Sequence, residues 1–380
     1  MASFDVIVIG AGIIGCACAL ECMQAGLRVG IVERDVPGGG ATAAGMGHVV
    51  VMDDSPAQLA LTVYSRSLWR DLLTSLPRSV EYESRGTVWV AADEEEMREV
   101  RTKQATYRAV GVASNVLDEQ ALAEAEPHLR EGLAGGLLVP DDGVIYPPAA
   151  AAWFLEQATR NGAVLLRGHA VARIDQGNVV FTNGTVHHAG QVLVASGADT
   201  NLLPWLPVQK RKGHLLITDR YPGLVHHQLV ELGYLKSAHA IQEDSVAFNI
   251  QPRLTGQLLI GSSRQYGDEQ REVDSAILRR MLHRALQYMP ALQQLSGVRV
   301  WTGFRAATPD KLPLIGPTED PCIYLAMGFE GLGITNAPGA ARIAVDHLLN
   351  RSSAIDATAY LPSRPGLMAT AAQKEVVRVG

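Results

Sequence analysis

The chain has 380 residues, of which 47% are hydrophobic, and its formal net charge is −6 at neutral pH. The length suggests two domains, or one large domain with an insertion, and it allows a large core without disulfide staples. The mild acidity argues against nucleic-acid binding, which needs a basic face.

The first segment has the pattern of a nucleotide-binding strand, turn and helix. An apolar run over 6–9 predicts a buried strand, and Gly10, Gly12 and Gly15 follow it as G-x-G-x-x-G. The first glycine permits a tight turn, the second lets the backbone approach a pyrophosphate, and the third lets the helix pack close to the strand. The predicted helix over 13–25 then offers its N-terminus to an anion.

A second apolar strand over 29–32 ends at Glu33, which lies 18 residues after Gly15. This is close to the usual spacing for an acid that binds ribose hydroxyls, and a carboxylate there would repel an NADP 2′-phosphate. A glycine-rich turn without a ligand is the alternative. Because strand, helix, second strand and acid occur in order, the sequence favours a bound dinucleotide, either a resident flavin or a nicotinamide that leaves in each cycle.

The four cysteines do not suggest a metal site. Cys16, Cys18 and Cys22 fall on the first helix without zinc-type partners, and we expect small core residues in a reducing compartment. Asp5, not a basic residue, precedes the apolar start, which argues against a signal peptide, and no apolar stretch is long enough to span a bilayer. The expected location is cytoplasmic.

Residues 36–54 are rich in glycine and alanine and have side chains too small to fill a core. Such a backbone can lie against a flat ligand. A helix over 55–75, a strand over 86–92 and an acidic helix over 93–111 follow. The three consecutive glutamates of the acidic helix indicate a solvated helix start.

The middle of the chain combines predicted helices and predicted strands. Residues 135–168 predict a strand, a turn, a helix and a strand. Residues 169–200 predict a β-meander with a hairpin turn at Asn183 and Gly184, and the meander ends in an apolar strand that runs into a glycine turn.

The rest of the chain is first mainly β and then returns to α/β. Residues 205–300 read as strands with one helix near 271–288. A strand over 322–328, a glycine turn and a helix over 337–349 follow.

These elements predict an α/β fold with a discontinuous Rossmann-like nucleotide domain and a second, α+β substrate domain on a mainly antiparallel sheet. The nucleotide domain is expected over 1–80, 145–205 and 305–365. The substrate domain is expected over 81–144 and 206–304.

Five segments in this order resemble the D-amino-acid oxidase superfamily of FAD-dependent oxidoreductases. They are GAGIIG with Glu33, ATAAGMGH, HAVARI, VLVASGA, and GFRAATPDKLPLIG followed by AMGFEGLGIT. The resemblance covers nearly the whole chain and is closest to the glycine oxidase, sarcosine oxidase β-subunit and D-hydroxyproline dehydrogenase branch. It implies a resident FAD, held by segments from both ends of the chain, and not a passing nicotinamide.

The resemblance also implies the residues that hold the cofactor. They are Gly10, Gly12, Ile14, Gly15, Glu33, Arg34, Thr42, Ala43, Ala44, Gly45, Met46, Val171, Ser196, Gly197, Gly303, Gly328, Gly331, Leu332, Gly333, Ile334 and Thr335. The last group, from Gly328 to Thr335, matches the loop and helix start beside the flavin pyrimidine ring. Reduction places negative charge there, which a helix N-terminus stabilises.

Arg305 is the strongest candidate for substrate binding. It lies among small and apolar residues in VWTGFRAATPD, and its planar fork suits a carboxylate, the role that the resemblance implies for it. The alternative is a core-edge arginine paired with Asp310. Glycine oxidase relatives carry a second arginine in a GxFRNG loop, and here that loop reads GFEGLG, so that arginine is absent and the resemblance does not fix the substrate.

Two further candidates near the flavin each have two readings. His48 follows the flavin-wrapping segment and either faces the flavin as a weak base or hydrogen-bonding group, or is a satisfied loop histidine. Glu330 either meets a substrate ammonium or hydroxyl group, or is a solvated loop acid.

Candidates for the substrate side are less specific. Phe248 and Tyr234 are aromatic walls of the substrate site or core residues. Lys212, Gly213 and His214 match a family loop near the substrate, where Lys212 is alternatively a surface charge.

The sequence therefore predicts FAD-dependent oxidation of a small amino or imino acid at the carbon next to nitrogen. The substrate amine must be neutral, the hydride passes to flavin N5, and no dedicated strong base is required. D-Hydroxyproline is the best candidate, with glycine or sarcosine as alternatives. A flavin subunit that passes electrons to partner subunits, a homo-oligomer and a non-catalytic FAD-binding fold stay open, although Arg305 argues against the last.

The flavin is expected to be bound without a covalent bond. Thr42 stands where some relatives carry a flavin-linked histidine, and GFRAATPD contains no cysteine. Precipitation of the purified protein with acid should therefore release the yellow colour into the supernatant. Colour that stays with the pellet would contradict this prediction.

Overall fold

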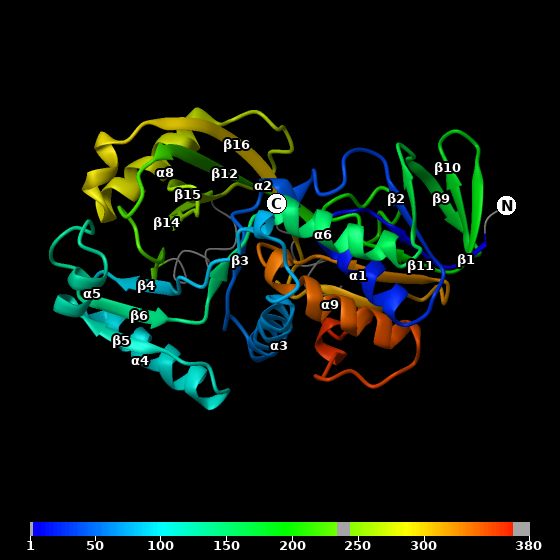
Figure 1. The fold of residues 1–380 in the computed structure, drawn as a ribbon, viewed down its shortest axis with the longest axis horizontal. Helices are drawn as coiled ribbons and strands as arrows, with labels where there is room; N and C mark the ends of the chain where they lie inside the picture. Colours follow the sequence, from blue (N-terminus) through cyan, green and yellow to red (C-terminus); the bar gives the residue numbers. More distant parts are fainter. Residues whose placement is uncertain (1–2, 234–243, 368–380) are drawn as a thin grey trace, which may run out of the picture.

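In the computed structural model, which describes residues 3–233 and 244–367, two lobes are each built on an eight-stranded sheet (Figure 1). The first lobe contains the N-terminal strand and the second contains most of the middle of the chain. The predicted α/β class is confirmed.

The first sheet is a parallel sheet with antiparallel additions. Its parallel strands are, in spatial order, β8 (Val164–Arg167), β2 (Val29–Glu33), β1 (Ser3–Ile9), β11 (Val186–Val194) and β18 (Ile323–Met327). The strand β17 (Leu314–Pro317) runs antiparallel at the edge, and β10 (Asn178–Phe181) and β9 (Val171–Asp175) form the expected meander with β11.

The alternation of apolar side chains along β1 explains why this sheet is covered on both faces. Val6 and Val8 belong to a core on one face, whereas Ile7 and Ile9 belong to a core on the other face. The helices on the first of these faces are α1 (Ile13–Gln24), α6 (Pro147–Arg160) and α9 (Gly333–Leu348).

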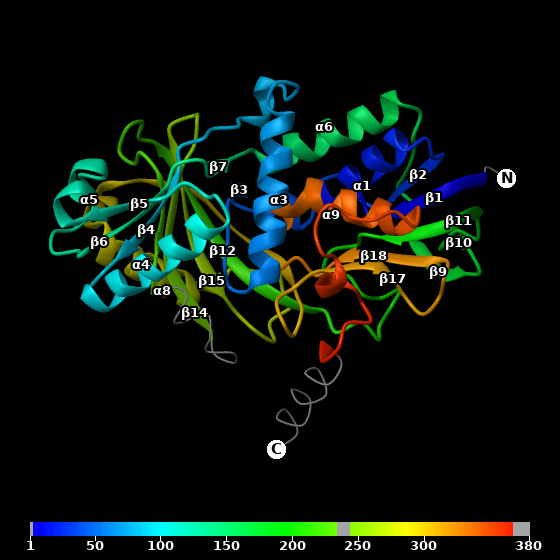
Figure 2. The same ribbon diagram turned by 90° about the horizontal axis from the view of Figure 1, so that it is seen from below.

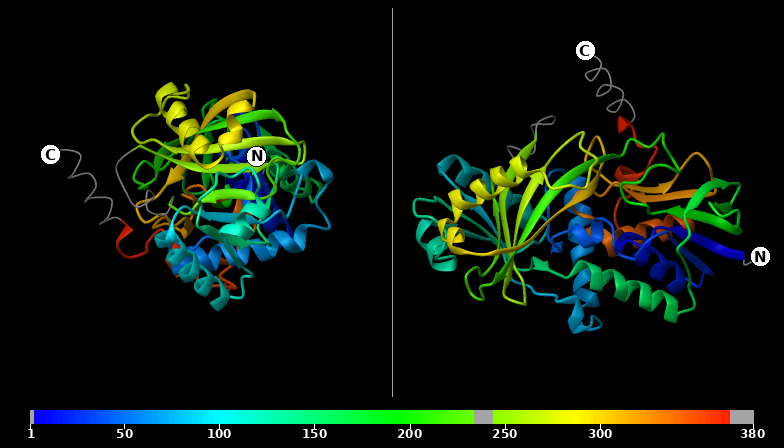
Figure 3. Two further views of the ribbon diagram at one scale, coloured as in Figure 1. Left: turned by 90° about the vertical axis from the view of Figure 1, so that its left-hand side faces the viewer. Right: turned by 90° about the horizontal axis from the view of Figure 1, so that it is seen from above.

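The second sheet is mainly antiparallel, as predicted, although β13 and β4 run parallel. Its strands are, in spatial order, β16 (Gly297–Ala307), β12 (Gln209–Arg220), β15 (Gln257–Arg264), β14 (Ser245–Pro252), β13 (Gln228–Glu231), β4 (Thr87–Ala91), β6 (Gly135–Val139) and β5 (Asn115–Asp118). The helix α8 (Ser275–Tyr288) covers the face opposite to the first lobe (Figure 3), and α4 (Glu94–Ala109) and α5 (Glu119–Ala125) pack at the other end of the sheet.

The helix α3 (Pro56–Leu72) stands between the lobes (Figure 2). It begins where the Ser55 hydroxyl accepts the Gln58 N–H, with Pro56 in the first turn, an arrangement that favours a helix start. The remaining short elements are α2 (Ala41–Ala44), β3 (His48–Val49), β7 (Gly143–Val144) and the 3-10 helices Arg78–Val80, Pro290–Gln294 and Thr358–Tyr360.

Two predicted boundaries near the cavity differ from the structure. The helix expected over 337–349 begins at Gly333, so Pro338 lies inside α9 and not at its start. The strand β16 continues to Ala307, so Arg305 belongs to the second sheet although a domain boundary was expected at 305. The domain division itself stays a prediction.

The acidic start of α4 is confirmed only in part. The Asp93 carboxylate accepts the Glu96 N–H and caps the helix, and Glu94 and Glu95 are exposed. Glu96 is buried, because its carboxylate accepts the Ala92 N–H at 2.8 Å.

All four cysteines are free thiols, and the three on α1 are buried. Burial raises the pKa of both Cys16 and Cys22 to about 12. Within residues 3–233 and 244–367, no group of three or more histidine, cysteine or acidic residues could hold a metal ion. Over the same residues, no helix has the length and apolar character needed to cross a membrane.

Candidate active site

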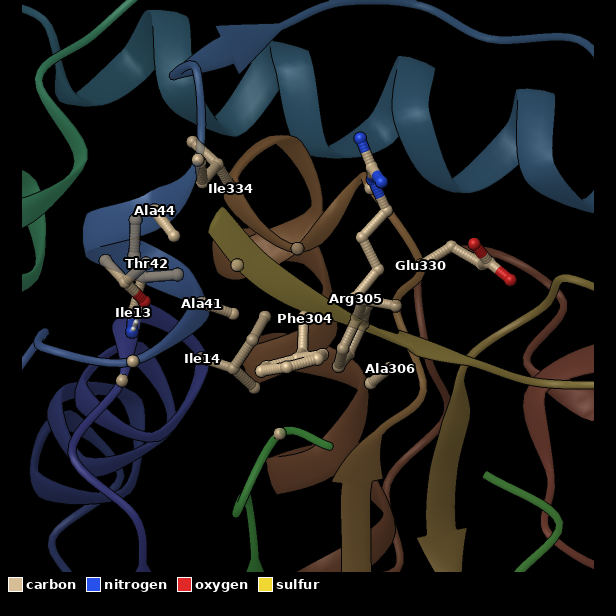
Figure 4. A pocket seen from close by; sticks show the side chains of 18 of the residues that line it. Ile13, Ile14, Ala41, Thr42, Ala44, Phe304, Arg305, Ala306, Glu330 and Ile334 are labelled. Carbon is tan, nitrogen blue, oxygen red and sulfur yellow. Dashed lines mark hydrogen bonds between the residues drawn. The ribbon is translucent and has the colours of Figure 1, made fainter. Parts of the chain in front are cut away.

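A cavity of about 1070 Å³ lies where the two lobes meet, and Figure 4 shows part of its wall. The β1–α1 turn, the segment after β2, the loop before α9 and one face of the second sheet all contribute to the wall. Pockets for drug-sized ligands measure about 300–1,000 Å³, so this cavity has room for a larger ligand.

The glycines of the β1–α1 turn have two different roles. A Cβ atom on Gly15 would lie 1.9 Å from the Gly10 carbonyl oxygen, so this glycine lets α1 pack against the turn. Gly10 has a φ of +106°, which favours glycine. A Cβ atom on Gly12 would meet only the Thr42 Oγ1 atom at 3.5 Å, and Gly12 opens on the cavity. Gly12 therefore leaves space for a ligand.

The Glu33 carboxylate is held at the C-terminal end of β2. Its two oxygens accept the N–H groups of Ala11 at 2.9 Å and Asp35 at 2.8 Å. Arg34, which also lines the cavity, donates to Asp199 at 2.5 Å and so joins this end of the cavity to the loop after β11.

The short helix α2 closes over the turn. The Thr42 hydroxyl accepts the Ile13 N–H at 3.0 Å and keeps its own O–H donor for another partner. A Cβ atom on Gly303 would lie 2.4 Å from the Ala44 Cβ, so the missing side chain lets β16 reach α2. The Trp301 indole N–H donates to the Ala44 carbonyl at 3.3 Å beside this contact.

The N-terminus of α9 opens on the same cavity. Gly333 and Ile334 line the wall, and the first N–H groups of a helix have no acceptor within the helix. The Thr335 hydroxyl donates to the His48 carbonyl at 2.9 Å and accepts the Val50 N–H at 3.2 Å. These two bonds attach the first turn of α9 to β3 and the residue after it.

Most residues predicted to hold the cofactor line the cavity. They are Gly10, Gly12, Ile14, Glu33, Arg34, Thr42, Ala44, Gly45, Met46, Val171, Ser196, Gly197, Gly303, Gly328, Gly331, Leu332, Gly333 and Ile334. The other three predicted residues are not part of the wall. Gly15 packs on Gly10, Ala43 is exposed on the outer side of α2, and Thr335 is buried in its bonds to β3.

These observations fit an FAD molecule. A glycine turn and a helix N-terminus suit a pyrophosphate, and a fixed carboxylate at Glu33 suits a ribose. The second helix N-terminus, at Gly333, also lines the cavity, and it would stabilise the negative charge that reduction places on a flavin ring.

Arg305 lies on the cavity face of β16, directly opposite Arg211 on β12. Its Nη1 donates to the Ser263 carbonyl at 2.9 Å, and a Cβ atom on Gly213 would lie 2.5 Å from that nitrogen. Gly213 therefore leaves the space that the guanidinium occupies. Figure 4 shows Arg305 extending away from β16 on the side opposite to Phe304.

The alternative pairing of Arg305 with Asp310 is wrong. The Asp310 carboxylate instead accepts a bidentate pair of hydrogen bonds from Arg364, with Nε 2.7 Å from Oδ2 and Nη2 2.9 Å from Oδ1. The Arg364 guanidinium lowers the pKa of Asp310, although burial opposes the shift. Arg305 and Asp310 thus serve different parts of the structure.

Glu330 forms an ion pair with Arg211 inside the cavity wall. Only 9% of the Glu330 side chain and 8% of the Arg211 side chain are exposed, so the reading of Glu330 as a solvated loop acid is wrong. The Glu330 backbone has a φ of +51°, and its N–H donates to the Ala306 carbonyl at 2.9 Å. This backbone bond fixes the carboxylate beside Arg211.

His48 is a neutral imidazole in the cavity wall. Burial, with smaller effects of the Arg253 and Arg305 charges, lowers the pKa of His48 to about 4. Its Nε2 atom has no hydrogen-bond partner in the part of the chain that the structure describes. The reading of His48 as a satisfied loop histidine is therefore wrong.

Two residues of the predicted substrate loop lie on β12 and face away from the cavity. Lys212 is 1% exposed and its Nζ contacts Asp268 at 2.7 Å, so it is not a surface charge. His214 is also buried, with Nδ1 2.9 Å from the Ser263 hydroxyl. Of the predicted group, only Gly213 lines the cavity, because alternate residues of a strand face opposite sides.

The predicted aromatic walls are not supported. Phe248 is fully buried on the face of the second sheet that α8 covers, where its ring stacks on Tyr288 at 4.8 Å. Its core reading is confirmed. Tyr234 lies outside the described residues.

A row of polar side chains that the sequence did not single out lines the cavity on the second sheet. The strand register places Thr87 of β4 opposite Gln228 of β13, and Val230 of β13 opposite Asn249 of β14. These residues share one face of the sheet with Trp89. The Gln228 Oε1 and Asn249 Oδ1 atoms are buried without a hydrogen-bond partner among residues 3–233 and 244–367. A polar residue inside a strand normally indicates a solvent face, so the sequence carries no signal for this row.

Comparisons with known proteins agree with this geometry. The family model described as FAD dependent oxidoreductase (DAO) matches residues 5–347. Glycine oxidase of Geobacillus kaustophilus is 28% identical over 95% of this chain and 97% of its own length. The crystal structure of glycine oxidase from the same organism superposes with a TM-score of 0.85 over 96% of this chain and 99% of that chain. Hydrogen cyanide synthase subunit HcnC of Pseudomonas aeruginosa is 26% identical over 97% of this chain and 99% of its own length.

The two kinds of glycine in the turn should respond differently to substitution. Gly15→Ala forces α1 away from the Gly10 carbonyl and should lower the free energy of unfolding of the flavin-free protein by about 1–3 kcal/mol. Gly12→Ala has room for its methyl group and should change that free energy by less than about 1 kcal/mol.

Gly12→Ala should instead raise the FAD dissociation constant roughly tenfold or more, because the methyl group takes ligand space. Urea unfolding and fluorescence titration with FAD measure the two effects. Equal effects of both substitutions on stability would contradict the assignment.

His48 should not set the pH dependence of the reaction. Its pKa of about 4 keeps the imidazole neutral over the working range, so the acid limb of kcat/KM belongs to the substrate ammonium group. His48→Gln should therefore leave the acid limb in place between about pH 5.5 and 9. If the limb disappears or moves in the variant, His48 is the titrating group and the prediction is wrong.

Proposed function

The chain belongs to the family of FAD-dependent oxidoreductases and is an amino-acid oxidase or dehydrogenase, and we propose that its substrate is the imino acid D-hydroxyproline. The reaction is removal of a hydride from the carbon next to nitrogen. Glycine and sarcosine are the alternative small substrates.

The position of Arg305 carries the proposal. This arginine lies in the same cavity as the cofactor glycines and the N-terminus of α9, and its guanidinium is fixed by the Ser263 carbonyl. A planar fork in a buried wall suits a carboxylate. A substrate held there by its carboxylate would share the cavity with the cofactor.

The polar row of the second sheet favours a substrate with a further hydrogen-bond donor. Gln228 and Asn249 line the cavity, each carries a side-chain carbonyl oxygen without a hydrogen-bond partner among the described residues, and a ring hydroxyl group is a donor of the kind that such an acceptor lacks. Glycine has no group that could reach this row. The ion pair between Glu330 and Arg211 also differs from the arginine-bearing loop of glycine oxidase relatives.

In this mechanism the protein binds, orients and excludes water. When bound, FAD supplies the hydride acceptor at its N5 atom. Arg305 holds the substrate carboxylate, and His48, with a pKa of about 4, is too weak a base to keep a proton at neutral pH. The substrate amine must be neutral when it reacts, because its nitrogen lone pair assists loss of the hydride from the neighbouring carbon. The product is an imine, which water hydrolyses unless it is cyclic.

A role as the flavin subunit of a larger assembly is the second candidate. The similarity to hydrogen cyanide synthase subunit HcnC over nearly the full length of both chains supports it. Such a subunit would be reduced by substrate at a normal rate but would turn over slowly until an artificial electron acceptor is added. An independent oxidase would instead produce peroxide with oxygen alone.

The first test is anaerobic mixing of the FAD-loaded protein with D-hydroxyproline. The yellow flavin band should bleach, and Arg305→Ala should raise the substrate concentration for half-maximal rate roughly 100-fold, because two charge-assisted hydrogen bonds are lost.

Arg305→Lys is the matched control, since it keeps the positive charge but loses the planar guanidinium that binds a carboxylate through two hydrogen bonds. Its substrate concentration for half-maximal rate should lie between those of the wild-type protein and Arg305→Ala. Absence of bleaching with well-bound flavin would exclude D-hydroxyproline, and bleaching by glycine or sarcosine in the same assay would establish the alternative.

A further inference from the structure

The helix α9 contains a proline that removes one of its own hydrogen bonds. Pro338 stands four residues after Ile334, inside the helix. A proline has no N–H group, so the Ile334 carbonyl loses its normal donor in the helix. A buried carbonyl without a donor costs free energy, and Ile334 is buried.

The indole of Trp69 replaces this donor from the neighbouring helix α3. Trp69 is 0% exposed, and its Nε1–H lies 3.1 Å from the Ile334 carbonyl oxygen and 2.9 Å from the Thr335 carbonyl oxygen. The two helices approach closely enough because a Cβ atom on Gly339 would lie 2.2 Å from the Ser65 Oγ. The donor is thus built into the contact of α3 with α9.

The turn that Trp69 holds is the one that faces the cofactor cavity. Gly333 and Ile334 line the wall, and the Thr335 hydroxyl binds the His48 carbonyl and the Val50 N–H on the other side. The first turn of α9 is therefore braced from two sides, by Trp69 through its carbonyls and by Thr335 through its side chain.

We propose that Trp69 is a positioning residue for the cofactor. Its N–H takes the place of the bond lost at Pro338 and so fixes the first turn of α9, whose residues line the cavity that would hold the flavin. Because a helix N-terminus stabilises negative charge, the aim of this turn affects both FAD affinity and the ease of flavin reduction. This role does not depend on which amino acid is oxidised.

Three variants separate hydrogen bonding from packing. Trp69→Phe keeps an aromatic ring beside Phe154, which Trp69 contacts edge-on at 5.5 Å, but removes the N–H. Pro338→Ala returns a backbone donor to the Ile334 carbonyl. The double variant combines the two changes. Fluorescence titration of the flavin-free proteins gives the FAD dissociation constant, and dye equilibration of the loaded proteins gives the flavin midpoint potential.

Trp69→Phe should raise the FAD dissociation constant about 5- to 20-fold, because a buried acceptor loses its donor, and should make the midpoint potential more negative. In the double variant both quantities should return toward the wild-type values. If the indole acted only through its volume, the backbone N–H that Pro338→Ala adds to α9 would not restore either quantity.

Two results would overturn the proposal. One is a Trp69→Phe variant with wild-type FAD affinity and midpoint potential. The other is a double variant as defective as Trp69→Phe, which would show that the indole acts through its volume. If Trp69→Phe fails to fold, folding of the double variant supports the proposal, and failure of both overturns it.

Discussion

The close approach of β16 to α2 joins the two lobes and makes the site possible. Gly303 has no side chain, so the second sheet reaches the backbone that closes over the cofactor turn, and the Trp301 indole secures the contact at the Ala44 carbonyl. Arg305 is the next residue on the same face of β16. One contact between the Gly303 backbone and the Ala44 side chain therefore brings Arg305, the proposed substrate-binding residue, to the cavity.

The cavity wall contains more hydrogen-bonding capacity than its own residues use. Buried polar atoms of His48, Trp89, Gln228 and Asn249 have no partner among residues 3–233 and 244–367, and all four residues line the cavity. Unpaired buried polar groups destabilise a protein, so they are retained where a ligand or water completes them. Other charges in the same wall are cancelled or absent. Glu330 forms an ion pair with Arg211, and the low pKa of His48 keeps its imidazole neutral.

Local patterns along the chain were reliable where one segment decides its own conformation. The G-x-G-x-x-G turn, the strand ending at Glu33 and the meander around Gly184 all form as predicted, because glycine geometry and apolar alternation act within a few residues. The start of α9 was predicted four residues late. A proline normally lies in the first turn of a helix, and here a tryptophan from another helix supplies the missing donor, which no local pattern shows.

The sequence by itself determined the fold class, because glycine spacing and strand ends carry that information locally, and its resemblance to a known family implied most of the residues that line the cavity. Only the tertiary structure decided which polar residues meet. Lys212 and Arg305 are both cations on neighbouring strands, yet strand register turns the first away from the cavity and the second into it. The partners of Asp310, Glu330 and Trp69 likewise come from distant segments, and packing between elements, not spacing along the chain, brings them into contact.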